Sequence, residues 1–225
     1  MDKFPRVAGA LFLVSTGAYM FGNGLLDPIL SRADFLANLY PDRTTVFSGT
    51  LLELINAMAV AAIAMLLFPI LKKHNEAFAL GYFGSRIMES ALLMISAIIP
   101  LVLITLSENS ISAGAAQDSF YEMTGKLLLE AHALLFQMSM IVLSLGSLLL
   151  CHVLYRSRLV PRFLSIIGFI GYSALLANSC LAILGREIGS VLYVPGAIFE
   201  IMFPLWIIVK GFKEQTNKMK VSNCQ

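Results

Sequence analysis

Two charges interrupt an otherwise apolar run within the segment Gly81-Tyr82-Phe83-Gly84-Ser85-Arg86-Ile87-Met88-Glu89-Ser90. The run covers 77–106, which is longer than the roughly 20 residues that a helix needs to cross a bilayer. A charge near the centre of such a helix costs about 2.5 to 3.5 kcal/mol on insertion scales. Arg86 and Glu89 are three residues apart and therefore share one helical face. We expect this pair to face other helices rather than lipid.

The composition of the whole chain places it in the class of helical membrane proteins. Of its 225 residues, 58% are hydrophobic and only 13% are charged, whereas a soluble domain typically has about 25% charged residues. The net charge of +2 is not typical of a nucleic-acid-binding protein, and we expect no nucleic acid partner. The three cysteines form no C-x-x-C motif, so neither a disulfide framework nor a thiolate metal site is predicted.

The apolar runs predict an all-α, polytopic membrane protein with six transmembrane helices. The first run is too long for the apolar core of a signal peptide, so we interpret it as a retained helix that Asp27-Pro28 ends. Residues 1–212 would form a single six-helix transmembrane domain, followed by a polar cytoplasmic tail at 213–225. The six helices are expected at about 7–26, 46–71, 77–106, 125–155, 163–185 and 191–211.

The positions of the basic residues predict the orientation in the membrane. Of the 16 Lys and Arg residues, eleven fall on the side of the two termini, four on the other side and one, Arg86, within the membrane. Cytoplasmic loops carry an excess of Lys and Arg. We therefore expect a multi-pass protein of the plasma membrane with both termini in the cytoplasm.

Polar residues on five of the expected helices suggest an interior site. At about 1.5 Å per residue, Arg86 and Glu89 lie near the midplane and the others lie closer to the outer face. The prediction is a polar cavity that opens to the outside, with the Arg86–Glu89 pair as its floor. Four acids against one fixed cation would require a bound cation or a protonated carboxyl. The candidate residues are Glu53, Asn56, Arg86, Glu89, Glu130, His132, Asn178 and Glu200.

Each candidate also has a purely structural interpretation. The Arg86–Glu89 pair is also compatible with an ion pair that fixes helix packing, and Glu53 and Asn56 with hydrogen bonds between helices. Glu130 and His132 are two residues apart and point to different faces, which argues against a joint metal site. Pro100 and Pro204 invite kinks in their helices, and 107–125 is expected to be the longest polar connection.

Three parts of the chain carry a family resemblance. They are Leu51-Leu52-Glu53-Leu54-Ile55-Asn56-Ala57 with 69–82 and 86–89, then 154–165, then 206–212. In these strings the chain resembles the prokaryotic membrane family catalogued as domain of unknown function 4386. The resemblance covers nearly all of the chain except its last dozen residues. It implies a bacterial or archaeal integral membrane protein and supplies no catalytic residues.

The leading functional hypothesis is a carrier-like protein for a small cation, a proton or a polar solute. In this hypothesis Glu89 and Glu200 would take up and release the ion, and the small size of the chain makes a homodimer plausible. The first alternative is an intramembrane enzyme for a lipid-type substrate with Glu53, Glu130 or His132 as acid–base group, although H-E-x-x-H and G-x-S-x-G are absent. The second is a sensor or interaction module that uses the loop 107–125. We expect no cofactor and no metal.

Overall fold

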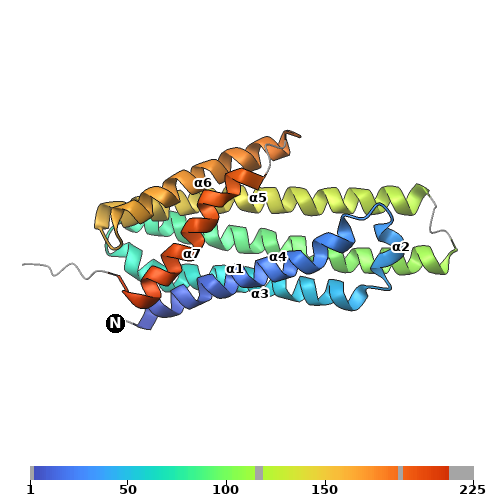
Figure 1. Ribbon diagram of the computed structural model, residues 1–225, viewed down its shortest axis with the longest axis horizontal. Coiled ribbons are helices and arrows are strands. Elements are labelled where there is room, and N and C mark those ends of the chain that lie inside the picture. Colours follow the sequence, from blue (N-terminus) through green and yellow to red (C-terminus); the bar gives the residue numbers. More distant parts are fainter. Residues whose placement is uncertain (1–2, 115–118, 187–189, 213–225) are drawn as a thin grey trace, which may run out of the picture.

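The computed structural model describes residues 3–114, 119–186 and 190–212, and over these residues its regular structure is entirely helical. The elements are α1 Lys3–Leu30, α2 Phe35–Leu39, α3 Arg43–Lys72, α4 Glu76–Ser112, α5 Ser119–Ser157, α6 Arg162–Ile183, the 3-10 helix η1 Ser190–Tyr193 and α7 Val194–Val209. Figure 1 shows α1, α3, α4 and α5 running roughly side by side along the long axis of the molecule, with α7 crossing obliquely to them.

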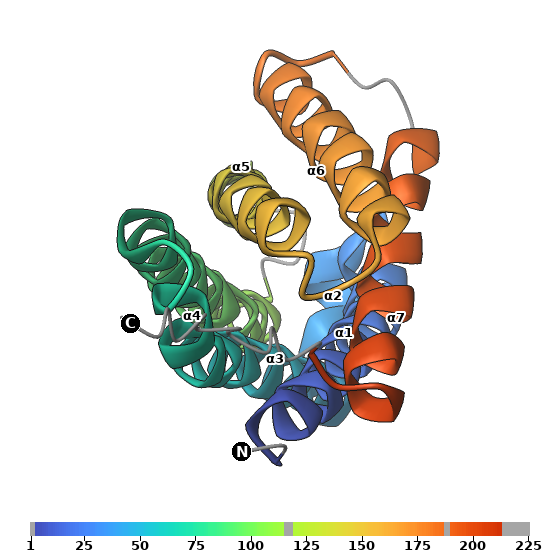
Figure 2. The same ribbon diagram turned by 90° about the vertical axis from the view of Figure 1, so that its left-hand side faces the viewer.

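The six longer helices in the described part of the chain pack as a closed ring. Each helix packs mainly against the next in the order α1, α3, α4, α5, α6 and α7, and α7 packs against α1 to close the ring. Figure 2 views this ring from one end, with α5 between α4 and α6, and with α7 beside α1. We call this end the basic end, because it carries Lys72, Lys73, Arg156, Arg158 and Arg162. The ring provides an interior that neither lipid nor water reaches easily.

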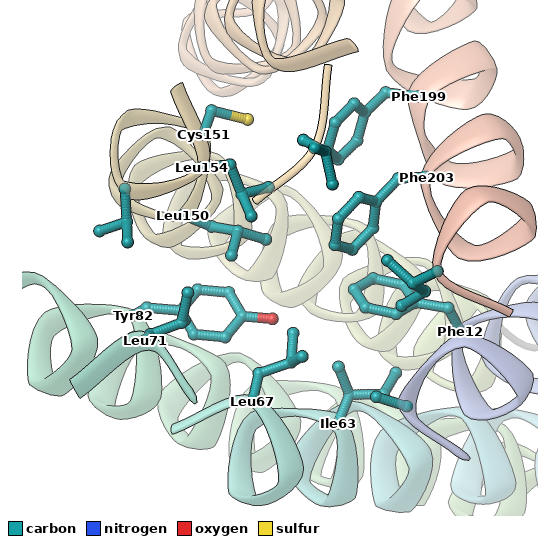
Figure 3. Close-up of a cluster of buried hydrophobic side chains, with 14 of the residues drawn as sticks. Phe12, Ile63, Leu67, Leu71, Tyr82, Leu150, Cys151, Leu154, Phe199 and Phe203 are labelled. Atoms are coloured by element: carbon teal, nitrogen blue, oxygen red, sulfur yellow. The ribbon is translucent and has the colours of Figure 1, made fainter. Parts of the chain in front are cut away.

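Large side chains from opposite sides of the ring fill that interior near the basic end. Figure 3 shows Phe12, Tyr82, Leu150 and Phe203 pointing inward from four different helices. The rings of Phe199 and Phe203 stack at 5.1 Å between centroids, and Phe12 meets Phe203 edge-on at 5.5 Å. Such aromatic pairs add about 0.5–1.5 kcal/mol beyond the area that they bury.

The short helix α2 closes the opposite end of the bundle. Its buried residues Phe35, Leu36 and Leu39 belong to a second apolar cluster with residues of α1, α3 and α4. Ser107 of α4 fixes α2 in place, because its hydroxyl donates to the carbonyl of Leu36 and accepts from the amide of Tyr40 at 3.0 Å. The connection between the first two expected spans, 7–26 and 46–71, therefore contains a packed helix.

Five of the helices in the described part of the chain are long and apolar enough to cross a membrane. This is compatible with an integral membrane protein. The sixth expected span is α7, which has 16 residues and a length of about 24 Å at 1.5 Å per residue. The hydrocarbon core is about 30 Å thick. The predicted count of six spans is therefore not confirmed by length alone, and the orientation of the termini stays a prediction.

Three predicted helix ends were wrong. Asp27-Pro28 does not end α1, because Ile29 is buried in the cluster around α2 and the helix continues to Leu30. The polar connection expected at 107–125 is mostly helical, since α4 extends to Ser112 and α5 begins at Ser119. Polar residues on exposed helical faces were mistaken for a loop. Residues 115–118 and the predicted tail 213–225 lie outside the described residues.

The contact between α6 and α7 depends on two glycines. A Cβ added at Gly171 would lie 2.6 Å from the backbone nitrogen of Gly196, and backbone atoms cannot move aside. We predict that Gly171→Ala destabilises the fold by about 1–3 kcal/mol, the usual cost of overpacking. Thermal unfolding in detergent, followed by circular dichroism, measures the effect.

Gly84→Ala is the matched control, because a Cβ at Gly84 meets nothing within 4 Å. This variant should be neutral or up to about 1 kcal/mol more stable, as expected for alanine in place of glycine within a helix. Equal melting temperatures for the two variants would contradict the close packing of α6 on α7.

Candidate functional site

A buried ion pair lies on the inner face of α4. Nη1 of Arg86 donates to Oε2 of Glu89 at 2.9 Å, and the two residues are only 4% and 3% exposed. This confirms that the pair faces the protein. The guanidinium lies 5.9 Å from the centroid of the Phe12 ring, and its Nε has no hydrogen-bond partner in the described part of the chain. The pair is thus enclosed by apolar side chains but retains an unused donor.

The same face of α4 extends through the ring in both directions. Tyr82, Arg86, Glu89, Leu93 and Ser96 follow one another at spacings of three or four residues, which places them on one side of the helix. Tyr82 is 1% exposed, and among the described residues its hydroxyl has no hydrogen-bond partner. Figure 3 shows this hydroxyl pointing into the centre of the ring. Polar groups therefore occur along the interior and not only at its middle.

A second acid approaches the ion pair from the other side of the ring. Glu200 of α7 is partly buried, and Oη of Tyr172 lies 3.4 Å from its Oε1. Glu200 is close enough to interact electrostatically with both Arg86 and Glu89. We call Arg86, Glu89, Tyr172 and Glu200 the central group. It combines two acids with a single guanidinium.

A small pocket lies further along the same face of α4, on the side away from the basic end. Its volume is about 20 Å³, which is room for one water-sized occupant. Ser15 donates to Oδ1 of Asn56 at 2.5 Å, and Nδ1 of His132 lies 2.9 Å from the hydroxyl of Ser96. The pocket draws on α1, α3, α4 and α5, and its lining residues are Tyr19, Glu53, Asn56, Leu93, Ser96, His132 and Phe136.

Tyr19 joins the two groups and was missed by the sequence analysis. It lines the small pocket and interacts electrostatically with both Glu53 and Glu200. Its ring stacks on Phe136 at 5.8 Å, which fixes its position. Ser15 lies one helical turn earlier on the same face of α1. The four-residue spacing of these two hydroxyls in an apolar helix is the sequence feature that could have identified Tyr19.

The structure brings most of the expected residues together, but as two neighbouring groups rather than one cavity. Arg86, Glu89 and Glu200 lie in the central group, whereas Glu53, Asn56 and His132 lie at the small pocket. The remaining two lie elsewhere. Glu130 is exposed on α5, since it is two residues from His132 and so points away from it. Asn178 is buried on α6, six residues beyond Tyr172 and on a different face of the helix.

The chemistry available at these groups is that of carboxylates, hydroxyls, the amide of Asn56, the imidazole of His132 and the guanidinium of Arg86. In the described part of the chain, no three His, Cys, Asp or Glu side chains are grouped so that they could hold a metal ion. The two groups are instead suited to binding a proton or a weakly held monovalent cation, or to exchanging protons with water in the small pocket.

The ion pair gives a direct stability prediction. We expect Arg86→Gln to destabilise the protein by about 3–5 kcal/mol, because it leaves the carboxylate of Glu89 buried without its partner. The double variant Arg86→Gln/Glu89→Gln should lose clearly less, since no charge is then left alone. Unfolding free energies from denaturant titration in detergent provide the measurement.

The exposed pair of Lys126 and Glu122 serves as the control, with a distance of 2.6 Å and side chains that are 62% and 51% exposed. Lys126→Gln should cost about 0.5 kcal/mol or less, as surface pairs contribute little. The buried-pair interpretation fails if the loss of unfolding free energy in the double variant equals the sum of the losses in Arg86→Gln and Glu89→Gln.

Comparison with known proteins places this architecture in a family. The family described as Domain of unknown function (DUF4386) matches residues 7–211. This range contains all the residues of the central group and of the small pocket. No curated protein and no solved structure matches the chain. Because the family match covers most of its length, the chain belongs to the DUF4386 family.

Proposed function

We propose that this protein is a carrier-like membrane protein that takes up a proton or a small cation at buried carboxylates inside its helical ring. The observation that carries the proposal is the charge of the central group. The guanidinium of Arg86 forms an ion pair with Glu89 at 2.9 Å, whereas Glu200 is hydrogen-bonded to the hydroxyl of Tyr172 at 3.4 Å. Two carboxylates that share a single guanidinium inside the ring leave one negative charge in excess, which is costly. A proton or a cation at Glu200 removes that cost.

A route for such an ion follows the inner faces of α1 and α4. The small pocket at Glu53 is the entry point, and Tyr19 lines this pocket and interacts electrostatically with both Glu53 and Glu200. Leu93 and Ser96 line the pocket, and Glu89 lies one helical turn from Leu93 on the same face. If the ion is a proton, a protonated carboxyl at one end of this route releases H⁺, and an ionised carboxylate at the other end accepts it. Arg86 holds Glu89 at the end of the route.

The proposed setting is the plasma membrane, with six spans and both termini in the cytoplasm. The excess of Lys and Arg on the side of the termini supports this orientation. Helix η1 adds four residues before α7, and at about 2 Å per residue the two elements together reach about 32 Å. This is enough for a sixth crossing of a hydrocarbon core of about 30 Å. The small pocket then lies in the outer half of the membrane.

The test is a flux measurement on the purified protein in liposomes. We expect wild-type protein to carry H⁺, read with a trapped pH-sensitive dye, or a monovalent cation, read with a radioactive tracer. Glu89→Gln and Glu200→Gln should each reduce the flux by about tenfold or more, the lower range of effect for losing a proton-transfer group. Glu130→Gln is the matched control, because it removes the same charge at an exposed site on α5.

Two results would refute the proposal. One is a wild-type flux no greater than that of empty liposomes for H⁺, Na⁺ and K⁺. The other is a flux that Glu89→Gln and Glu200→Gln leave at the level of Glu130→Gln. Melting temperatures of all three variants establish that they fold.

The linking role of Tyr19 gives a separate prediction. Tyr19→Phe keeps the ring that stacks on Phe136 but removes the hydroxyl that interacts electrostatically with Glu53 and Glu200. We expect a clear loss of flux with an unchanged melting temperature. Tyr40→Phe makes the same chemical change near α2, far from the central group, and should leave the flux intact. Equal flux in both variants would exclude Tyr19 from the route.

A further inference from the structure

A second and larger pocket lies at the basic end, between the start of α4 and the last turns of α5. Its volume is about 450 Å³, which falls within the range of about 300–1,000 Å³ for small-molecule sites. None of the features described above for the ring interior contributes to it. Its lining residues are His74, Asn75, Phe78, His152, Val153, Arg156 and Ser157.

The lining of this pocket offers hydrogen-bond donors and positive charge without an opposing acid. His74, His152 and Arg156 contribute nitrogen groups from two separate segments, and among the described residues no Asp or Glu lines the pocket. The nearby acid Glu76 does not line it, and its carboxylate instead pairs with Nζ of Lys72 at 2.9 Å. The charges that line the pocket therefore favour the binding of an anion.

Two contacts orient the donors. The ring of His152 meets the ring of Phe78 edge-on at 4.9 Å between centroids. Oδ1 of Asn75 accepts a hydrogen bond from the amide of Phe78 at 3.0 Å, so this residue caps α4 and its amide nitrogen is left to donate. The pocket also lies at the N-terminus of a helix of 37 residues, where the helix dipole favours negative charge.

His74 and Arg156 have different roles in the pocket. Burial and the neighbouring charge of Lys73 lower the pKa of His74, so at neutral pH its imidazole is uncharged and offers one N–H donor. Arg156 supplies the permanent charge and a planar guanidinium, which binds a phosphate through two parallel hydrogen bonds. Several hydrogen-bond donors around one fixed cation suit a phosphate group better than a bare halide ion.

We propose that this pocket binds a phosphate group, carried either by the headgroup of an anionic lipid or by a soluble phosphate compound. Both sources would present phosphate oxygens to Arg156, His152 and the start of α4. The pocket is open at the end of the bundle, where a headgroup can enter from the membrane surface and a soluble phosphate from the aqueous side. This site is separate from the carboxylates of the central group and does not depend on the proposed ion transport.

The test uses the full-length protein in nanodiscs and has two arms. In phosphatidylcholine nanodiscs, calorimetry measures the binding of inorganic phosphate. In nanodiscs that also contain phosphatidic acid, native mass spectrometry measures how much of this lipid stays on the protein. The variant His152→Gln/Arg156→Gln removes two donors from the pocket. We expect it to weaken binding by about tenfold or more in the arm where wild type binds.

Arg158→Gln is the matched control, because Arg158 is exposed, lies two residues from Arg156 and does not line the pocket. Selective loss of inorganic phosphate binding in the double variant supports a soluble ligand, and selective loss of phosphatidic acid supports a lipid. The proposal is overturned if wild type binds in neither arm. It is also overturned if the double variant matches the Arg158→Gln control in both arms, since the effect would then reflect general surface charge.

Discussion

Inside the ring, the guanidinium of Arg86 donates to the carboxylate of Glu89 at 2.9 Å, and solvent reaches neither group. Two charges in such a place are stable only while they remain together and away from lipid. A single helix cannot provide that shield, because its outer face is always exposed. The closed arrangement of α1, α3, α4, α5, α6 and α7 does so, and this accounts for the ring.

The same constraint explains how the ring is packed. Near the pair, the interior is filled by aromatic side chains such as Phe12 and Phe203, which exclude water and place a ring face beside the guanidinium. The α6–α7 side closes tightly because Gly171 lets the two backbones meet. This close approach brings Tyr172 and Glu200 to the interior. The packing that buries the Arg86–Glu89 pair thus also places Glu200 near it.

The sequence predicted local features of the fold better than it predicted the arrangement of the site. The long apolar runs and the three-residue spacing of Arg86 and Glu89 are local features. Among the described residues five helices are long and apolar enough to cross a membrane, and Arg86 and Glu89 share one helical face as predicted. Depth along a helix follows from counting residues, but direction around it depends on the neighbouring helices. Glu130 therefore has the depth expected of a cavity residue and still points outward. Tyr19 was missed for the converse reason, since its role depends on which face of α1 meets α3 and α5.

The division of the polar residues into two groups has a physical consequence of its own. Had Glu53, Glu89 and Glu200 shared one cavity, three carboxylates would compete for a single guanidinium, and repulsion between them would open the ring. Glu53 lies at the small pocket, so the central group contains only two acids, and Tyr19 interacts electrostatically with Glu53 and Glu200 without adding a charge. The arrangement keeps the interior closed while leaving one acid in excess, which is the condition that binding a single positive charge requires.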